Sequence, residues 1–145
     1  MSKIKVLFLC IHNSARSQMA EAYLNKFGDE NFIVESAGLE AGKLNPLAVE
    51  VMKEDNIDIS GNQTKDVFKF FREGRVYNYV ITVCDEASAS QCPVFPGVHK
   101  KMNWSFKDPS SLSGSYEEKL VVTREVRDQI KNVVQNFIKQ IKNPS

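Results

Sequence analysis

A short stretch near the start of the chain, from Cys10 to Ser17, constrains the fold more than any other part of the sequence. It follows an apolar run typical of a buried strand and leads into a segment whose apolar residues have helical spacing. A cysteine and an arginine, Cys10 and Arg16, bracket the loop between the two. A strand, a tight loop and a helix in this order are typical of an α/β protein with a parallel sheet.

The loop has the features of an oxyanion site. Its backbone N–H groups can converge on one point, and the helix that follows adds the positive end of its dipole. We expect a tetrahedral anion of phosphate size there, with the Arg16 guanidinium holding two of its oxygens. The residues expected to surround the anion are Ile11, His12, Asn13, Ser14, Ala15 and Arg16.

Cys10 is expected beneath this anion, where the positive field favours its thiolate form. A cysteine that ends a buried strand is usually an inert packing residue, but the neighbours of this one favour a nucleophile. Ser17 can donate a hydrogen bond to the sulfur, and Asn13 suits a left-handed position in the loop. The His12 side chain is expected to point outward while its N–H serves the anion.

The rest of the chain continues the alternation of strands and helices. Strands are predicted over residues 3–9, 32–38, 76–83 and 98–104, and helices over residues 17–27, 47–55, 64–72 and 116–141. In the third helix, we expect Phe68 and Phe71 to face inward. Together these elements predict a single domain over residues 1–145, a three-layer α/β/α fold with a four-stranded parallel sheet.

Composition narrows the classes of partner. The 145 residues carry a net charge of +1, so we expect neither nucleic acid nor a membrane surface as a partner. No apolar run approaches the ~18 residues of a membrane span, and the first residues are too short for a secretory signal. We therefore expect a cytoplasmic monomer. Three cysteines, Cys10, Cys84 and Cys92, are too few for a disulfide scaffold and are read as catalytic, redox or packed residues.

Reactive residues follow three of the predicted strands. Cys10 follows the first, Cys84 the third and Asp108 the fourth, so a parallel sheet brings them to one edge. Pro109 bars Asp108 from helical geometry and fixes its loop. An acid near a leaving oxygen can act as a general acid, although an Asp-Pro pair alone is more often an ordinary turn.

The pattern Cys-x5-Arg-Ser resembles the signature loop of low-molecular-weight protein tyrosine phosphatases and of the arsenate reductases that share their fold. The residues after it, Gln18 to Glu21, look more like those of the reductases. The resemblance covers nearly the whole chain and implies that Asp108 is the general acid. Ser110 and Ser111 stand where the phosphatases usually carry aromatic residues that grip a phenyl ring, which favours a small inorganic substrate.

In the reductases that this chain resembles, three thiols act in turn. The resemblance implies that Cys10 attacks arsenate, that Cys84 forms a disulfide with Cys10 as arsenite leaves, and that Cys92 takes over the disulfide with Cys84. Thioredoxin then reduces this disulfide, with glutaredoxin and glutathione as the alternative reductant. The small, polar residues 85–91 lack apolar anchors, so we expect this segment to rearrange. It is one residue longer than in the reductases, and Ala15 replaces a loop cysteine.

Two other functions stay open. A phosphatase acting on phosphotyrosine or small aryl phosphates would use Cys10, Arg16 and Asp108 alone, and phosphate or sulfate would bind as substrate analogues of arsenate. A non-enzymatic oxyanion-binding redox sensor would use Cys84 and Cys92 as a switch.

The resemblance also implies a candidate cation site beside the loop. We expect no tightly bound cofactor, but some of these reductases hold a potassium ion there. The matching residues would either bind such an ion through oxygen ligands or form a hydrogen-bond network that braces the loop. They are Asn13, Glu21, Ser36, Thr64 and Asp66.

Overall fold

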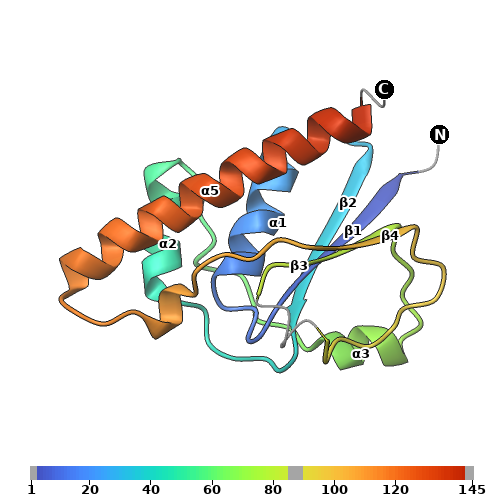
Figure 1. Cartoon of the computed structure of the whole chain (residues 1–145), viewed down its shortest axis with the longest axis horizontal. Helices are drawn as coiled ribbons and strands as arrows, with labels where there is room; N and C mark the ends of the chain where they lie inside the picture. The colour runs from blue at the N-terminus through green and yellow to red at the C-terminus, as the bar shows by residue number, and fades with distance from the viewer. Residues whose placement is uncertain (1–2, 85–89, 143–145) are drawn as a thin grey trace.

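The computed structural model describes residues 3–84 and 90–142. Within them, four parallel strands form one sheet in the order β2-β1-β3-β4, which confirms the predicted α/β architecture (Figure 1). The strands are β1 (Ile4–Cys10), β2 (Phe32–Gly38), β3 (Tyr79–Thr82) and β4 (Lys100–Asn103). The helices are α1 (Arg16–Phe27), α2 (Pro46–Glu54), α3 (Val67–Arg72) and α5 (Tyr116–Lys142), with a short 3-10 turn, η1 (Pro109–Ser111).

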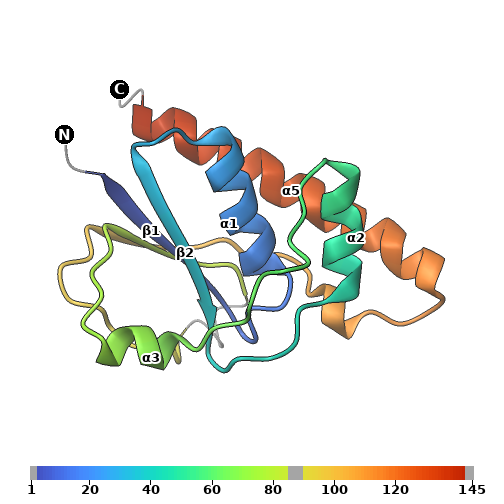
Figure 2. The same cartoon turned by 180° about the vertical axis from the view of Figure 1, so that it is seen from behind.

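The sheet is the middle of three layers. Side chains of β1 alternate between its two faces, as the pleat of a strand requires. Val6 and Phe8 pack on the face that α1, α2 and α5 cover, whereas Leu7 and Leu9 pack on the other face with Phe70 of α3. Figures 1 and 2 show α5 lying across α1 and α2, with α3 on the far side of the sheet. Burial of β1 on both faces explains its continuous apolar sequence.

The long C-terminal helix confirms the prediction from its 3.6-residue apolar period. Val126, Ile130, Val134 and Phe137 of α5 are buried in the cluster that α5 forms with α1, α2 and one face of the sheet, and each contributes about 1.5–3 kcal/mol to stability. In the part of the chain that the structure describes, no helix is both long and apolar enough to cross a membrane.

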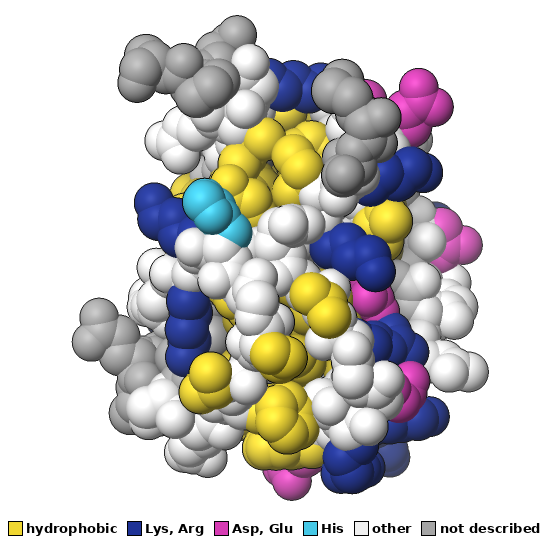
Figure 3. Space-filling view, turned by 90° about the vertical axis from the view of Figure 1, so that its right-hand side faces the viewer, with side chains coloured by type: hydrophobic (Ala, Val, Ile, Leu, Met, Phe, Trp, Pro, Cys, Tyr) yellow, Lys and Arg dark blue, Asp and Glu magenta, His cyan; other side chains and the backbone are white. Residues whose placement is uncertain are grey.

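Two features differ from the sequence-based expectations. The prediction that Phe68 and Phe71 face inward is wrong: both are exposed, and Val67 and Phe70 are buried in their place. The helix begins later than expected because the Asp66 carboxylate accepts the Phe68 N–H and caps it. With α3 beginning at Val67, the side chains of Val67 and Phe70 face the sheet. The face of the molecule in Figure 3 shows apolar side chains in its upper part, beside the cyan histidine, and in its lower part, at the height of α3 in Figure 1.

The third strand is also shorter than expected. It begins at Tyr79: the backbone N–H of the preceding Asn78 donates to the Lys5 carbonyl at 2.9 Å, but the Lys5 N–H donates to the side chain of Asn78 at 2.8 Å. The ladder to β1 then runs without interruption from Tyr79 to Thr82.

Candidate active site

Residues from three strands meet at the carboxyl edge of the sheet. Cys10 is the last residue of β1, Cys84 lies two residues beyond β3, and Asp108 follows β4. The Val83 N–H donates to the Leu9 carbonyl at 2.7 Å, so the pairing of the two central strands continues to the level of Cys10. The parallel topology therefore places these three residues at the same edge, as the sequence predicts.

The thiol of Cys10 lies buried under the loop with two hydrogen-bond partners. Its Sγ is 2.8 Å from the Ser17 hydroxyl and accepts the N–H of Asn13 at 3.0 Å. The Asn13 side-chain amide donates to the Ser17 oxygen at 2.7 Å, which leaves the hydroxyl proton of Ser17 available to a Cys10 thiolate. The predicted Ser17 bond to Cys10 is present, and both donors suit a thiolate.

Asn13 holds the loop in shape. Its φ is 56°, the left-handed conformation that the sequence predicts, and its side chain is fully buried. Its Oδ1 accepts hydrogen bonds from the side chain of Gln18 at 3.0 Å and from the backbone N–H of Lys65 at 3.1 Å. Gln18 also donates to the carbonyl of Gln63. Sequence reasoning missed this bracing role of Gln18, although a polar residue on the apolar face of a helix was a usable signal.

Arg16 and Asp108 face each other across the site. Arg16 is buried at the first position of α1, donates to the Phe106 carbonyl at 3.2 Å and lies 3.5 Å from the Asp108 carboxylate. Ala15 precedes the helix and makes no side-chain cap bond, so the first amides of α1 keep their donors for an anion. The structure thus places the predicted oxyanion-binding guanidinium and the predicted general acid beside one loop.

Asn45 joins the Cys10 loop to the Asp108 loop. Its N–H donates to the Ser14 carbonyl at 2.9 Å, and its side chain donates to the Ser110 hydroxyl at 3.0 Å. The Ser110 N–H in turn donates to the Asp108 carboxylate at 2.9 Å. Sequence reasoning missed Asn45, whose one signal was its place before Pro46 at the start of α2.

The segment after β2 packs against the back of the loop. The Glu40 N–H donates to the Ile11 carbonyl at 3.1 Å, and a Cβ at Gly38 would come within 2.7 Å of the Asn13 nitrogen. This close approach requires glycine. The His12 side chain points outward to the Glu40 carboxylate at 3.3 Å, as expected.

The two remaining thiols lie in different clusters. Cys84 is buried in the same cluster as Cys10, whereas Cys92 is buried on the opposite face of the sheet with Tyr77 and Phe95. Burial raises the pKa of Cys92 to about 11, and its Sγ donates to the Pro93 carbonyl at 3.4 Å. Residues 85–89, on which the expected rearrangement partly falls, lie outside the described residues.

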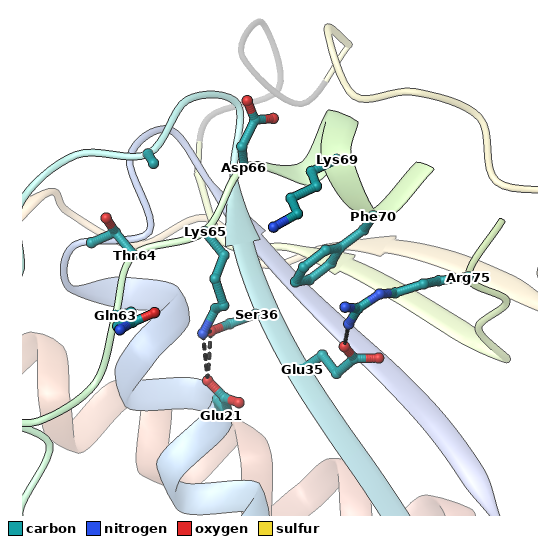
Figure 4. A pocket seen from close by; sticks show the side chains of 11 residues that line it. Glu21, Glu35, Ser36, Gln63, Thr64, Lys65, Asp66, Lys69, Phe70 and Arg75 are labelled. Atoms are coloured by element: carbon teal, nitrogen blue, oxygen red, sulfur yellow. Dashed lines mark hydrogen bonds and ion pairs between the residues drawn. The ribbon is translucent and has the colours of Figure 1, made fainter. Parts of the chain in front are cut away.

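The five residues of the candidate cation site do not form one ligand shell. Glu21 and Ser36 lie together, and Figure 4 shows the Lys65 side chain reaching toward them. Thr64 and Asp66 are turned to other partners, the Gly42 carbonyl and the Phe68 N–H. The residues present therefore do not fit a potassium ion at this place, and the hydrogen-bond network is the arrangement observed.

Comparison with known proteins agrees with this geometry. The family of low molecular weight phosphotyrosine protein phosphatases matches residues 5–145. The chain belongs to that family. An arsenate reductase of Oceanobacillus iheyensis is 42% identical over 96% of this chain and 98% of its own, and one of Bacillus subtilis is 42% identical over 91% and 93%.

Solved structures agree with the family. An arsenate reductase in the phosphate binding state superposes with a TM-score of 0.76 at 35% identity, covering 95% of this chain and 98% of its own. A thioredoxin-dependent arsenate reductase of Corynebacterium glutamicum gives 0.74 at 28% identity, covering 97% of this chain and 63% of its own. The three-layer fold with a four-stranded parallel sheet is therefore the fold of this family.

Proposed function

We propose that this protein reduces arsenate to arsenite, with Cys10 as the nucleophile and thioredoxin as the final source of electrons. The observation that carries the proposal is the burial of Cys84 in the same cluster as Cys10, within a site built for an oxyanion. Hydrolysis of a phosphate ester needs one thiol, whereas reduction needs further thiols to supply two electrons. The names of the similar proteins support the same activity.

The first step forms a bond between sulfur and arsenic. The Cys10 thiolate attacks the arsenic of an arsenate that would be held by the loop amides and by the guanidinium of Arg16, which faces the Asp108 carboxylate in the structure. One arsenic–oxygen bond breaks, and the protonated Asp108 carboxyl gives its proton to the departing oxygen, which leaves as water. Arsenic stays in the +5 state, bound to Cys10.

The second step transfers the electrons. The thiolate of Cys84 attacks the Cys10 sulfur, a disulfide forms between them, and the electron pair of the sulfur–arsenic bond goes to arsenic, which leaves as arsenite. The two thiols are thereby oxidised by two electrons, and arsenic is reduced from +5 to +3. The Cys92 thiolate then attacks Cys84 and releases Cys10, and a thioredoxin dithiol reduces the resulting disulfide.

Cys92 lies near enough to Cys84 for the charges of the two thiols to interact, but it must leave its apolar surroundings before it can act. Its thiol is buried on the face of the sheet opposite to Cys10 and Cys84, and its raised pKa keeps it protonated. Oxidation of the other two thiols is expected to be followed by a rearrangement of residues 85–91 that releases Cys92 from its cluster. This rearrangement also carries the final disulfide toward the surface, where a protein reductant reaches it.

A test of the relay compares arsenate-dependent NADPH oxidation, in the presence of thioredoxin and thioredoxin reductase, for the wild type, Cys84→Ser and Cys92→Ser. We expect turnover in the wild type and its loss in both variants, with arsenite produced in step with NADPH. Single-turnover release of arsenite is expected to persist in Cys92→Ser, because the first disulfide still forms. Replacing thioredoxin by glutaredoxin and glutathione tests the identity of the reductant.

Aryl phosphate hydrolysis supplies the control. The same loop accepts phosphate, so slow hydrolysis by the wild type and by both serine variants is compatible with the proposal. Brisk hydrolysis, unaffected by either substitution and without arsenate turnover, would show a phosphatase whose extra cysteines are packing residues. Anion binding without turnover of either substrate would show a sensor.

A further inference from the structure

A lysine ammonium lies among the residues that the sequence suggested for a cation site. The Lys65 Nζ is 3.7 Å from the Glu21 carboxylate and donates to the Ser36 hydroxyl oxygen at 3.4 Å. These groups line a cavity of about 460 Å³ beside the Cys10 loop. Figure 4 shows the Lys65 side chain extending into it from the segment between α2 and α3.

We infer that Lys65 is a built-in cation that braces the catalytic loop, so that the protein needs no potassium ion. Lys65 is a positioning residue in this assignment, because it touches no reacting atom. The inference rests on the geometry behind the loop and stands whichever oxyanion the site turns over.

The polar groups at this place are matched to an ammonium. The Ser36 hydroxyl donates to Glu21 at 2.5 Å, which leaves the lone pairs of its oxygen for the donor from Lys65. Ser36 is fully buried and Glu21 is largely so, with 18% of its side chain exposed. A partly buried carboxylate requires a nearby positive charge, and a lysine supplies it as a compact point charge.

The remaining oxygens of the candidate metal site are engaged elsewhere. The Thr64 hydroxyl donates to the Gly42 carbonyl at 2.6 Å, and Asp66 Oδ1 accepts the Phe68 N–H at 2.8 Å as the cap of α3. The Asn13 side-chain oxygen already accepts from Gln18 and from the backbone of Lys65. A hard cation needs several oxygens converging on it, and a second positive charge beside Lys65 is repelled.

Lys65 is connected to the nucleophile through its own backbone. Its N–H donates to Asn13, which donates to Ser17, which in turn contacts the Cys10 sulfur. Its carbonyl accepts the N–H of Gly38 at 2.8 Å at the end of β2. The ammonium therefore ties one segment to α1 and to β2 at the point where that segment supports the loop.

The test measures cation dependence in the complete protein. Thermal unfolding and carboxymethylation of Cys10 by iodoacetate are recorded at equal ionic strength in potassium chloride and in N-methylglucamine chloride, for the wild type and for Lys65→Ser. We expect no difference between the salts for the wild type. In N-methylglucamine we expect Lys65→Ser to melt about 3–6 °C lower, with Cys10 reacting several-fold more slowly. Potassium is expected to restore at least half of each loss, because an ion then neutralises Glu21.

Two further variants make the result specific. Lys69→Met is the matched control, because Lys69 reaches into the same cavity and has no ion pair with any residue that the structure describes. We expect it to behave as the wild type in both salts. Lys65→Met keeps the length of the side chain without the charge; it replaces the serine variant if that fails to fold, and its losses are expected to persist in potassium because the methyl group fills the ion's place.

Three outcomes overturn the assignment. The first is that potassium raises the melting temperature of the wild type, which would show a metal site beside the lysine. The second is that Lys65→Ser has the melting temperature and the Cys10 reactivity of the wild type in both salts, which would show that the ammonium does not brace the loop. The third is that Lys65→Ser loses stability and Cys10 reactivity equally in both salts, which would show that the side chain contributes packing rather than charge. None of these readouts uses arsenate, so failure here is distinguishable from failure of the proposed reaction.

Discussion

Cys10 and Cys92 are both buried thiols, yet their surroundings prepare them for different tasks. The Cys10 sulfur accepts the Asn13 N–H, shares a hydrogen bond with the Ser17 hydroxyl, and lies at the positive end of α1. The Cys92 sulfur lies among apolar side chains and itself donates to a carbonyl. The first environment suits an ionised nucleophile, and the second stores a protonated thiol until the chain releases it.

The stored state of Cys92 has a measurable signature. Burial raises its pKa to about 11, so about one molecule in a thousand carries the thiolate at pH 8. In a Cys10→Ser, Cys84→Ser background, alkylation of Cys92 by iodoacetamide, followed by mass spectrometry, is expected to accelerate about tenfold per pH unit up to at least pH 9.5. A rate that levels off near pH 8.5 would contradict this, because it would show a thiol with ordinary access to water.

At the level of elements, the apolar periods of the sequence were enough for the order of strands and helices and for the parallel sheet. The Cys10 loop was also predictable, because its residue types suit its conformation: Asn13 has the left-handed backbone and Ser17 bonds to the sulfur. The orientation of α3 was not predictable, because it depends on which residue caps the helix. Asp66 caps it, and Phe68 and Phe71, which the sequence predicted to face inward, are exposed.

Contacts between loops far apart in the sequence could not be predicted either. Nothing in the neighbourhood of Asn45 or Lys65 shows that one reaches Ser110 and the other Glu21. Such contacts depend on the packed arrangement of several elements, and one of them changed the interpretation of the candidate cation site. The sequence pattern identified Glu21 as a ligand, but its partner is a side chain of the same protein.

Asn45 offers a test of how α2 and the Asp108 loop are linked. Its Oδ1 accepts the Leu47 N–H as the cap of α2, and its amide donates to Ser110. Asn45→Ser keeps a good cap but is too short to reach Ser110, whereas Asn45→Ala loses both interactions. We expect Asn45→Ala to lower the free energy of unfolding in urea by about 1–2 kcal/mol and Asn45→Ser by less than half of that.

Catalysis is expected to separate from stability in these variants. Both are expected to lower kcat for arsenate by a similar factor, about threefold to tenfold, because Ser110 then positions Asp108 less firmly. Unchanged kcat in Asn45→Ser, alongside intact stability, would show that the Asp108 loop is held without this link.

On the scale of the whole molecule, three helices meet at one polar junction on the outside of the sheet. The Tyr23 hydroxyl of α1 donates to Asp55, the residue that follows α2, at 2.6 Å, and Lys131 of α5 donates to the same carboxylate at 3.2 Å. The hydrogen bond from Tyr23, followed by that from Lys131, lowers the pKa of Asp55. Burial, and then the bond to Asp55, raises the pKa of Tyr23. Two hydrogen bonds to one carboxylate thus join α1, α2 and α5.

These opposite shifts predict a stability that falls at both ends of the pH range. Asp55 has a lowered folded-state pKa, so its contribution is present above its unfolded value of about 3.9 and is lost as the pH falls through the folded value. Tyr23 has a raised folded-state pKa, so its contribution to stability is present below about pH 10, its unfolded pKa, and is lost as the pH rises toward the folded-state pKa. Tyr23→Phe is therefore expected to cost about 1.5–3 kcal/mol near pH 7, and progressively less as the pH falls below about 3.9 or rises above about 10. Urea unfolding across this range measures it, with Tyr116→Phe, an exposed tyrosine at the start of α5, as the matched control. A cost that stays constant from pH 3 to pH 11 would mean that the ring of Tyr23, and not its bond to Asp55, joins the helices.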